Sequence, residues 1–72
     1  MIMAFNEHDT FYLSKPIPHE ETPVNTRGTV LLVFESDPRA YEVEFCDEEG
    51  NNLGSSLTFT LTEEFMTPEP IG

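Results

Sequence analysis

The sequence predicts a small all-β domain, either an SH3-like barrel or an antiparallel meander of four to five strands, with one short 3-10 turn near the C-terminus. Three observations predict it. Apolar and polar residues alternate with a period of two in several short segments. Segments rich in proline, glycine and asparagine separate them. The 72 residues leave room for one core, so residues 1–72 are expected to form a single domain.

The first strand is expected over residues 9–14, where Phe11 and Leu13 fall on one face. Residues 1–8 show no period and are expected to be loosely ordered. Residues 15–26 contain three prolines, which remove the donors that a sheet needs. This segment is therefore predicted to be a long loop within the domain.

The second strand follows Gly28, which is expected in a tight turn or a bulge. Residues 29–34 are almost continuously apolar, which is typical of a strand that is central or covered on both faces. The Asp-Pro step within residues 35–40 then predicts a chain reversal.

The third strand, over residues 40–46, has the cleanest alternation. Its core face would hold Tyr41, Val43 and Phe45, and its outer face Glu42, Glu44 and Cys46. Residues 47–52 predict a hairpin turn, and residues 53–62 predict the next strand, with threonines on its exposed face.

A short 3-10 turn is expected over residues 62–65, with Thr62 as its cap and glutamates in its first positions. Phe65 and Met66 would then return to the core. Residues 67–72 contain two prolines and are expected to end the fold in a loosely ordered tail.

The charge balance restricts the partners. Fourteen acidic residues face three basic ones, giving a formal net charge of −11. Such a charge repels nucleic acid and anionic lipid and attracts basic proteins, although it can also serve solubility alone. The expected partner is therefore a basic protein, with no nucleic acid and no membrane. One cysteine and no signal-peptide pattern indicate a cytoplasmic protein.

Catalytic and metal-binding patterns are weak. Cys46 lies on a strand beside carboxylates, whereas catalytic cysteines have electropositive surroundings. His8 and His19 show no recognised ligand spacing, and Gly50 is misplaced for an EF-hand loop. The sequence therefore predicts neither an enzyme nor a cofactor or metal site.

An acidic stripe along one hairpin is the candidate binding site. Whichever of Tyr41 and Tyr12 is exposed is a candidate aromatic anchor beside it. The alternative is a solvated face that guards against edge pairing. The stripe comprises Glu42, Glu44, Asp47, Glu48 and Glu49, with Glu35 and Asp37 at the opposite end of the strand.

Three segments, RGTVLLVFE, AYEVEFCDEEGN and SLTFTLTEEF, resemble domain-of-unknown-function family 4926, a set of short bacterial and cyanobacterial proteins. The matching positions are Gly28 to Val30, Ala40 to Phe45, Gly50, and Leu57 to Leu61. The chain departs from the family pattern in its proline-rich loop before Gly28 and in its tail after Phe65. The resemblance implies an SH3-like fold and a role as an antitoxin or immunity partner, with no catalytic residues to carry over.

The function expected from these observations is a small acidic protein-interaction module, antitoxin- or immunity-like, which neutralises a basic partner through the acidic hairpin. One alternative is an inhibitor, encoded by a phage or mobile element, that mimics nucleic acid. Another is an accessory subunit of a larger complex that binds through Ile17 and Val24, with incidental charge.

Overall fold

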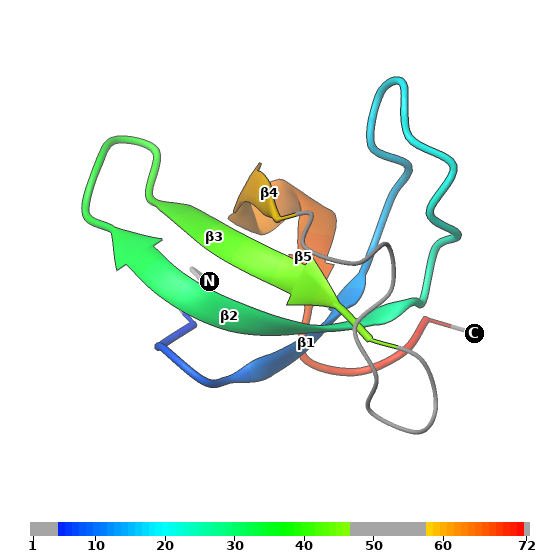
Figure 1. Ribbon diagram of the computed structural model, residues 1–72, viewed down its shortest axis with the longest axis horizontal. Helices are drawn as coiled ribbons and strands as arrows, with labels where there is room; N and C mark the ends of the chain where they lie inside the picture. The colour runs from blue at the N-terminus through cyan, green and yellow to red at the C-terminus, as the bar shows by residue number, and fades with distance from the viewer. Residues whose placement is uncertain (1–4, 47–57, 72) are drawn as a thin grey trace.

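The computed structural model describes residues 5–46 and 58–71, which form an all-β domain with a lone 3-10 turn near the C-terminus (Figure 1). This confirms the predicted fold class. The predicted hairpin over 47–52 lies outside the described residues. The elements are β1 (Thr10–Leu13), β2 (Arg27–Phe34), β3 (Ala40–Phe45), β4 (Phe59–Thr62), the 3-10 turn η1 (Glu63–Phe65) and β5 (Met66–Thr67).

The five strands form one antiparallel sheet in the order β4-β3-β2-β1-β5. The two edge strands, β4 and β5, are joined only by η1. In a flat sheet they would lie roughly 19 Å apart, at about 4.8 Å per strand, whereas the four residue steps from Thr62 to Met66 span at most about 14 Å. The sheet therefore curls into a half-barrel, as Figure 1 shows.

The core fills the concave side of this half-barrel. Its aromatic rings meet edge to face or tilted, with centroids 5.6 Å apart for Phe11 and Phe45 and 5.4 Å apart for Phe45 and Phe59. The buried apolar residues alternate along β1 and β3, as predicted. They are Phe5, Phe11, Leu13, Val30, Tyr41, Val43, Phe45, Leu61 and Met66.

Gly28 corrects one prediction, because it lies within β2 and not in a turn or bulge. It pairs in regular register with Phe11 on one side and Phe45 on the other. A Cβ atom at this position would lie 2.5 Å from the Phe11 ring and 2.7 Å from the carbonyl oxygen of Glu44. The glycine is needed because the Phe11 ring packs against the strand backbone.

The irregularity of β2 lies further along the strand, between Val30 and Leu32, where the register with β3 shifts. The strand is central, as predicted, but it is not covered on both faces. Beyond the shift, Val33 packs against the core, whereas Leu32 and Phe34 are exposed. An extra residue in the strand reverses the alternation, so the inward face changes from even to odd positions.

The ends of the described chain are held more firmly than expected. Phe5 is buried in the core, and the His8 amide donates to the carbonyl of Val30 at 2.7 Å, so order begins before Asp9. In the tail, the side-chain amide of Asn25 donates to the Ile71 carbonyl at 2.6 Å and accepts from its N–H at 2.8 Å. Both ends therefore pack against the domain.

The η1 turn occurs where it was predicted, but the expected capping hydrogen bond at its N-terminus is not formed. Thr62 makes no side-chain capping hydrogen bond, and its hydroxyl lies instead 3.4 Å from the Glu64 carboxylate. Met66 is buried and Phe65 packs partly buried against the core, as predicted. The described part of the chain contains no helix long and apolar enough to cross a membrane.

Candidate functional site

The central part of the predicted acidic stripe lies on the outer face of β3. Glu42 and Glu44 alternate with Tyr41, Val43 and Phe45, whose side chains are buried in the core. The two glutamates are half-buried and lie on the outer face. The fold therefore places both carboxylates on the outer face of β3, which lies between β4 and β2 in the sheet.

The neighbours of Glu42 on this face come from two strands. Leu32 of β2 lies opposite it on one side and Thr60 of β4 on the other. Cross-strand neighbours on one face have Cβ atoms about 5 Å apart, close enough for side-chain contact. Glu42 is thus bordered by one exposed apolar and one exposed polar residue.

Glu35 and Asp37 lie in the loop that joins β2 to β3. Glu35 pairs with Arg39 at 3.4 Å, although the Glu35 side chain is 76% exposed. Asp37 is exposed and precedes Pro38 through a cis peptide bond. The loop thus places acidic groups beside the Phe34 end of β2, as predicted.

Three further residues of the predicted stripe, Asp47, Glu48 and Glu49, lie outside the described residues. The part of the predicted stripe that the structure describes therefore consists of Glu42 and Glu44 on the outer face of β3, with Glu35 and Asp37 in the adjacent loop.

Tyr41 was a candidate surface anchor, but its side chain is fully buried. The prediction was wrong because Tyr41 shares the core face with Val43 and Phe45, opposite the glutamates. The other candidate anchor, Tyr12, is half-buried and pairs with Arg27 and Thr67 in the neighbouring strands.

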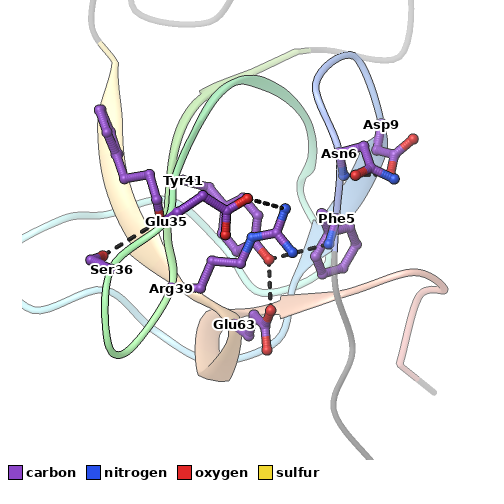
Figure 2. A network of polar contacts seen from close by, with 9 residues as sticks. Phe5, Asn6, Asp9, Glu35, Ser36, Arg39, Tyr41 and Glu63 are labelled. Atoms are coloured by element: carbon purple, nitrogen blue, oxygen red, sulfur yellow. Dashed lines mark hydrogen bonds and ion pairs between the residues drawn. The ribbon is translucent and has the colours of Figure 1, made fainter.

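The Tyr41 hydroxyl joins a polar network at one end of the core (Figure 2). It donates to the Glu63 carboxylate at 2.6 Å and accepts from the Phe5 N–H at 3.2 Å. The Arg39 guanidinium lies 5.5 Å from the centre of the Tyr41 ring. The Phe5 ring meets the Tyr41 ring edge-on, with the two ring centres 5.8 Å apart. The network ties β3 to the N-terminal segment and to η1.

Burial raises the pKa of the Tyr41 phenol above its usual value, and the hydrogen bond to Glu63 raises this pKa further. The Phe5 N–H and the Arg39 charge act in the opposite direction. Tyr41 therefore stays protonated and donates a hydrogen bond at neutral pH, so its role in this arrangement is structural.

A second polar contact ties the proline-rich loop to η1. Lys15 Nζ lies 2.6 Å from the Glu64 carboxylate and 5.0 Å from the centre of the Phe65 ring. The hydrogen bond from Lys15 lowers the pKa of the Glu64 carboxyl below its usual value, and the charge of Lys15 adds to this effect. Two of the three basic residues, Lys15 and Arg39, are thus engaged in ion pairs with glutamates.

The residues considered for catalysis or metal binding are dispersed. Cys46 is half-buried, with its sulfur 4.0 Å from the Thr29 hydroxyl, and His8 and His19 are exposed. Within residues 5–46 and 58–71, no three His, Cys, Asp or Glu side chains gather closely enough to hold a metal ion.

A comparison with family models gives one match. The model of DUF4926, a domain of unknown function, matches residues 7–67. The chain belongs to the DUF4926 family. No match was found among curated proteins or among solved structures.

The DUF4926 match spans all five strands and η1. Phe5, whose N–H donates to the Tyr41 hydroxyl, precedes the matched segment, and Ile71, which bonds to the Asn25 side chain, follows it. The family description assigns no activity, so the function of this DUF4926 protein has to be argued from its own surface.

Sequence reasoning missed one feature of that surface, the exposure of Leu32 and Phe34 beside Glu42. The continuous apolar run over residues 29–34 carried a signal, because apolar residues at both odd and even positions place some of them on the outer face. Which of these residues stay exposed on the outer face is decided by the tertiary structure.

Proposed function

We propose that this DUF4926 protein is a small acidic interaction module that neutralises a basic partner protein, in the manner of an antitoxin or immunity protein. The observation that supports the proposal is the placement of Glu42 and Glu44 on the outer face of β3, whose inner face is buried. A strand held by its core face presents both carboxylates about 7 Å apart. Little backbone freedom is then lost on binding.

The overall charge supports the same function. A net charge of −11 attracts a basic surface and accelerates its approach, and the gain falls as salt screens the field. Lys15 and Arg39 are engaged within the domain by Glu64 and Glu35. We propose that the protein acts by binding a partner and not by catalysis. We also propose that it does so in the cytoplasm.

The test is affinity capture from a lysate of the native host at low and high salt, with the retained proteins identified by mass spectrometry. Three baits are compared: the wild type, Glu42→Lys/Glu44→Lys, and Glu20→Lys/Glu21→Lys. The last pair makes the same change of charge on the exposed proline-rich loop. Thermal unfolding of each bait verifies that it is folded.

A basic protein that is captured at low salt, lost at high salt, and lost specifically from the Glu42→Lys/Glu44→Lys bait supports the proposal. Equal capture by all three baits would contradict it, as would equal loss from both charge-reversed baits, because general charge would then explain binding.

The alternatives give different outcomes in the same experiment. A nucleic-acid mimic would capture a nucleic-acid-binding protein that added DNA or RNA displaces. An accessory subunit would retain a multi-subunit complex at high salt through apolar contacts. For that alternative, Ile17 packs partly buried against the core, whereas Val24 is exposed.

A further inference from the structure

Two large apolar side chains stand on the outer face of β2. Leu32 is 46% exposed and Phe34 is 42% exposed, while Val33 between them packs against the core. Across the sheet, Leu32 faces Glu42, and Phe34 faces Ala40. We call Leu32 and Phe34 the apolar pair.

The apolar pair is exposed because of the register shift between Val30 and Leu32. In phase with Gly28 and Val30, which are buried, residues 32 and 34 would point into the core. The shift turns them outward and turns Val33 inward. A β-bulge is a built feature that re-aims side chains, so this exposure is fixed by the backbone of the central strand.

The charges around the apolar pair indicate what it contacts. Glu42 lies directly opposite Leu32, and Glu35 follows Phe34 with a largely exposed side chain, although it also pairs with Arg39. Arg27 lies at the far end of the same strand, roughly 23 Å from Phe34 at about 3.3 Å per residue. The border of the apolar pair therefore holds the carboxylates of Glu42, Glu35 and the exposed Asp37 against one basic group, Arg39, and its net charge is negative.

A second copy of the chain is a poor occupant of this face. It carries the same net charge of −11, and packing the two outer faces together brings the glutamates beside the apolar pair close to those of the other copy. Like charges in such contacts oppose association. A basic surface with an apolar side chain of its own matches both the pair and its border.

We propose that the apolar pair is the anchor site of the binding surface and that it receives an apolar side chain which the basic partner presents between Lys or Arg residues. This deepens the proposed function and rests on it. Binding then has two separable parts, a salt-sensitive part from Glu42 and its acidic neighbours and a salt-resistant part from Leu32 and Phe34.

The test uses two synthetic peptides of equal length and charge, one alternating lysine with leucine and the other alternating lysine with threonine. Each is titrated into the ¹⁵N-labelled full chain at low and high salt, and amide shifts locate the contact. The variants are Leu32→Thr/Phe34→Thr and, as a matched control, Val24→Thr/Ile71→Thr, which changes two exposed apolar residues elsewhere. Threonine suits exposed strand positions, so Leu32→Thr/Phe34→Thr should fold. Val24 and Ile71 lie outside the strands and are exposed, so their replacement should be tolerated as well.

The expected result is that the lysine-leucine peptide binds the wild type about tenfold more tightly, a difference of about 1.4 kcal/mol. The shifts should centre on Leu32, Phe34 and Glu42, and the preference should persist at high salt. Leu32→Thr/Phe34→Thr should bind both peptides alike, weakly and only at low salt, while Val24→Thr/Ile71→Thr should behave as the wild type.

Equal binding of both peptides near Glu42 would overturn the anchor site and leave the acidic module standing. Failure of both peptides to bind at low salt would overturn the two proposals together. Shifts confined to the proline-rich loop would overturn the anchor, because the peptides would then bind elsewhere. Self-association of the wild type that Leu32→Thr/Phe34→Thr abolishes would also overturn it, because a second copy would then cover the apolar pair.

Discussion

Tyr41 connects three segments that are distant in the sequence. Its hydroxyl contacts Phe5 and Glu63, which lie 36 and 22 residues away. Its ring contacts both the Phe5 ring and the Arg39 guanidinium. A single side chain thus holds the N-terminal segment and η1 against β3.

Replacing this hydroxyl tests its contribution. Tyr41→Phe keeps the ring and leaves the Phe5 N–H and the Glu63 carboxylate without their partner, so we expect a loss of about 1–2 kcal/mol in the free energy of unfolding. Urea unfolding measures it. Tyr12→Phe, at a half-buried position, serves as the control, and we expect its effect to stay within about 0.5 kcal/mol. Equal effects would show that the network adds no stability.

The raised pKa of Tyr41 predicts a pH dependence. The folded protein holds this proton more tightly than the unfolded chain, so the contribution of Tyr41 is complete below the unfolded pKa of about 10 and is lost as pH rises through the folded pKa. The free energy of unfolding should therefore fall more steeply above about pH 10 for the wild type than for Tyr41→Phe. Parallel profiles would contradict the assignment.

Gly28 makes a second prediction for a single residue. Gly28→Ala places a Cβ atom against the Phe11 ring and the Glu44 carbonyl oxygen, and the backbone oxygen cannot move without disturbing the β2–β3 pairing. We expect a loss of about 2–3 kcal/mol in urea unfolding. In a double-mutant cycle, Phe11→Leu should recover part of this loss. Strict additivity would show that the ring is not the obstacle.

At the scale of elements, the proline-rich loop is fixed to the strands at its base. The Leu13 N–H donates to the Thr26 carbonyl, and the Asn25 N–H donates to the Leu13 carbonyl. Asn25 has a φ of 75°, a left-handed conformation that asparagine tolerates better than most residues. This conformation accompanies the two hydrogen bonds between the Asn25 side chain and Ile71, one donated by Asn25 and one donated by the Ile71 N–H.

Two substitutions separate the backbone role of Asn25 from its side-chain role. Asn25→Gly keeps the left-handed conformation and removes the amide, whereas Asn25→Ala removes the amide and adds backbone strain. Both should abolish hydrogen-exchange protection of the Ile71 amide, and only Asn25→Ala should also lose about 1 kcal/mol of stability from that strain. Retained Ile71 protection in both variants would show that the side chain does not hold the tail.

At the scale of the whole molecule, charge opposes compactness. A net charge of −11 in a 72-residue chain repels itself, and the repulsion is greater in the folded state than in the expanded chain. Added NaCl screens this repulsion. The acidic surface proposed for binding therefore has a cost in stability.

The corresponding prediction is that the urea midpoint of unfolding rises as NaCl is increased from low to moderate concentration. Glu20→Gln/Glu21→Gln, which removes two exposed charges from the proline-rich loop, should show a smaller rise. A midpoint that falls with NaCl would indicate that attractive pairs, such as Lys15 with Glu64, outweigh the repulsion.

The sequence by itself determined the features that depend on local pattern. The alternation in β3 separates Glu42 and Glu44 from the core, the prolines make residues 15–26 a loop, and η1 occurs where it was expected. These follow from side-chain period and backbone restriction, which act over a few residues.

Only the tertiary structure decided the features that depend on contacts between distant segments. The register shift exposes Leu32 and Phe34, and the fold brings Phe5 and Glu63 to the Tyr41 hydroxyl. Gly28 is required by the Phe11 ring on the neighbouring strand. A period of two does not reveal where an extra residue interrupts it, because the sum of packing across the whole sheet selects the register.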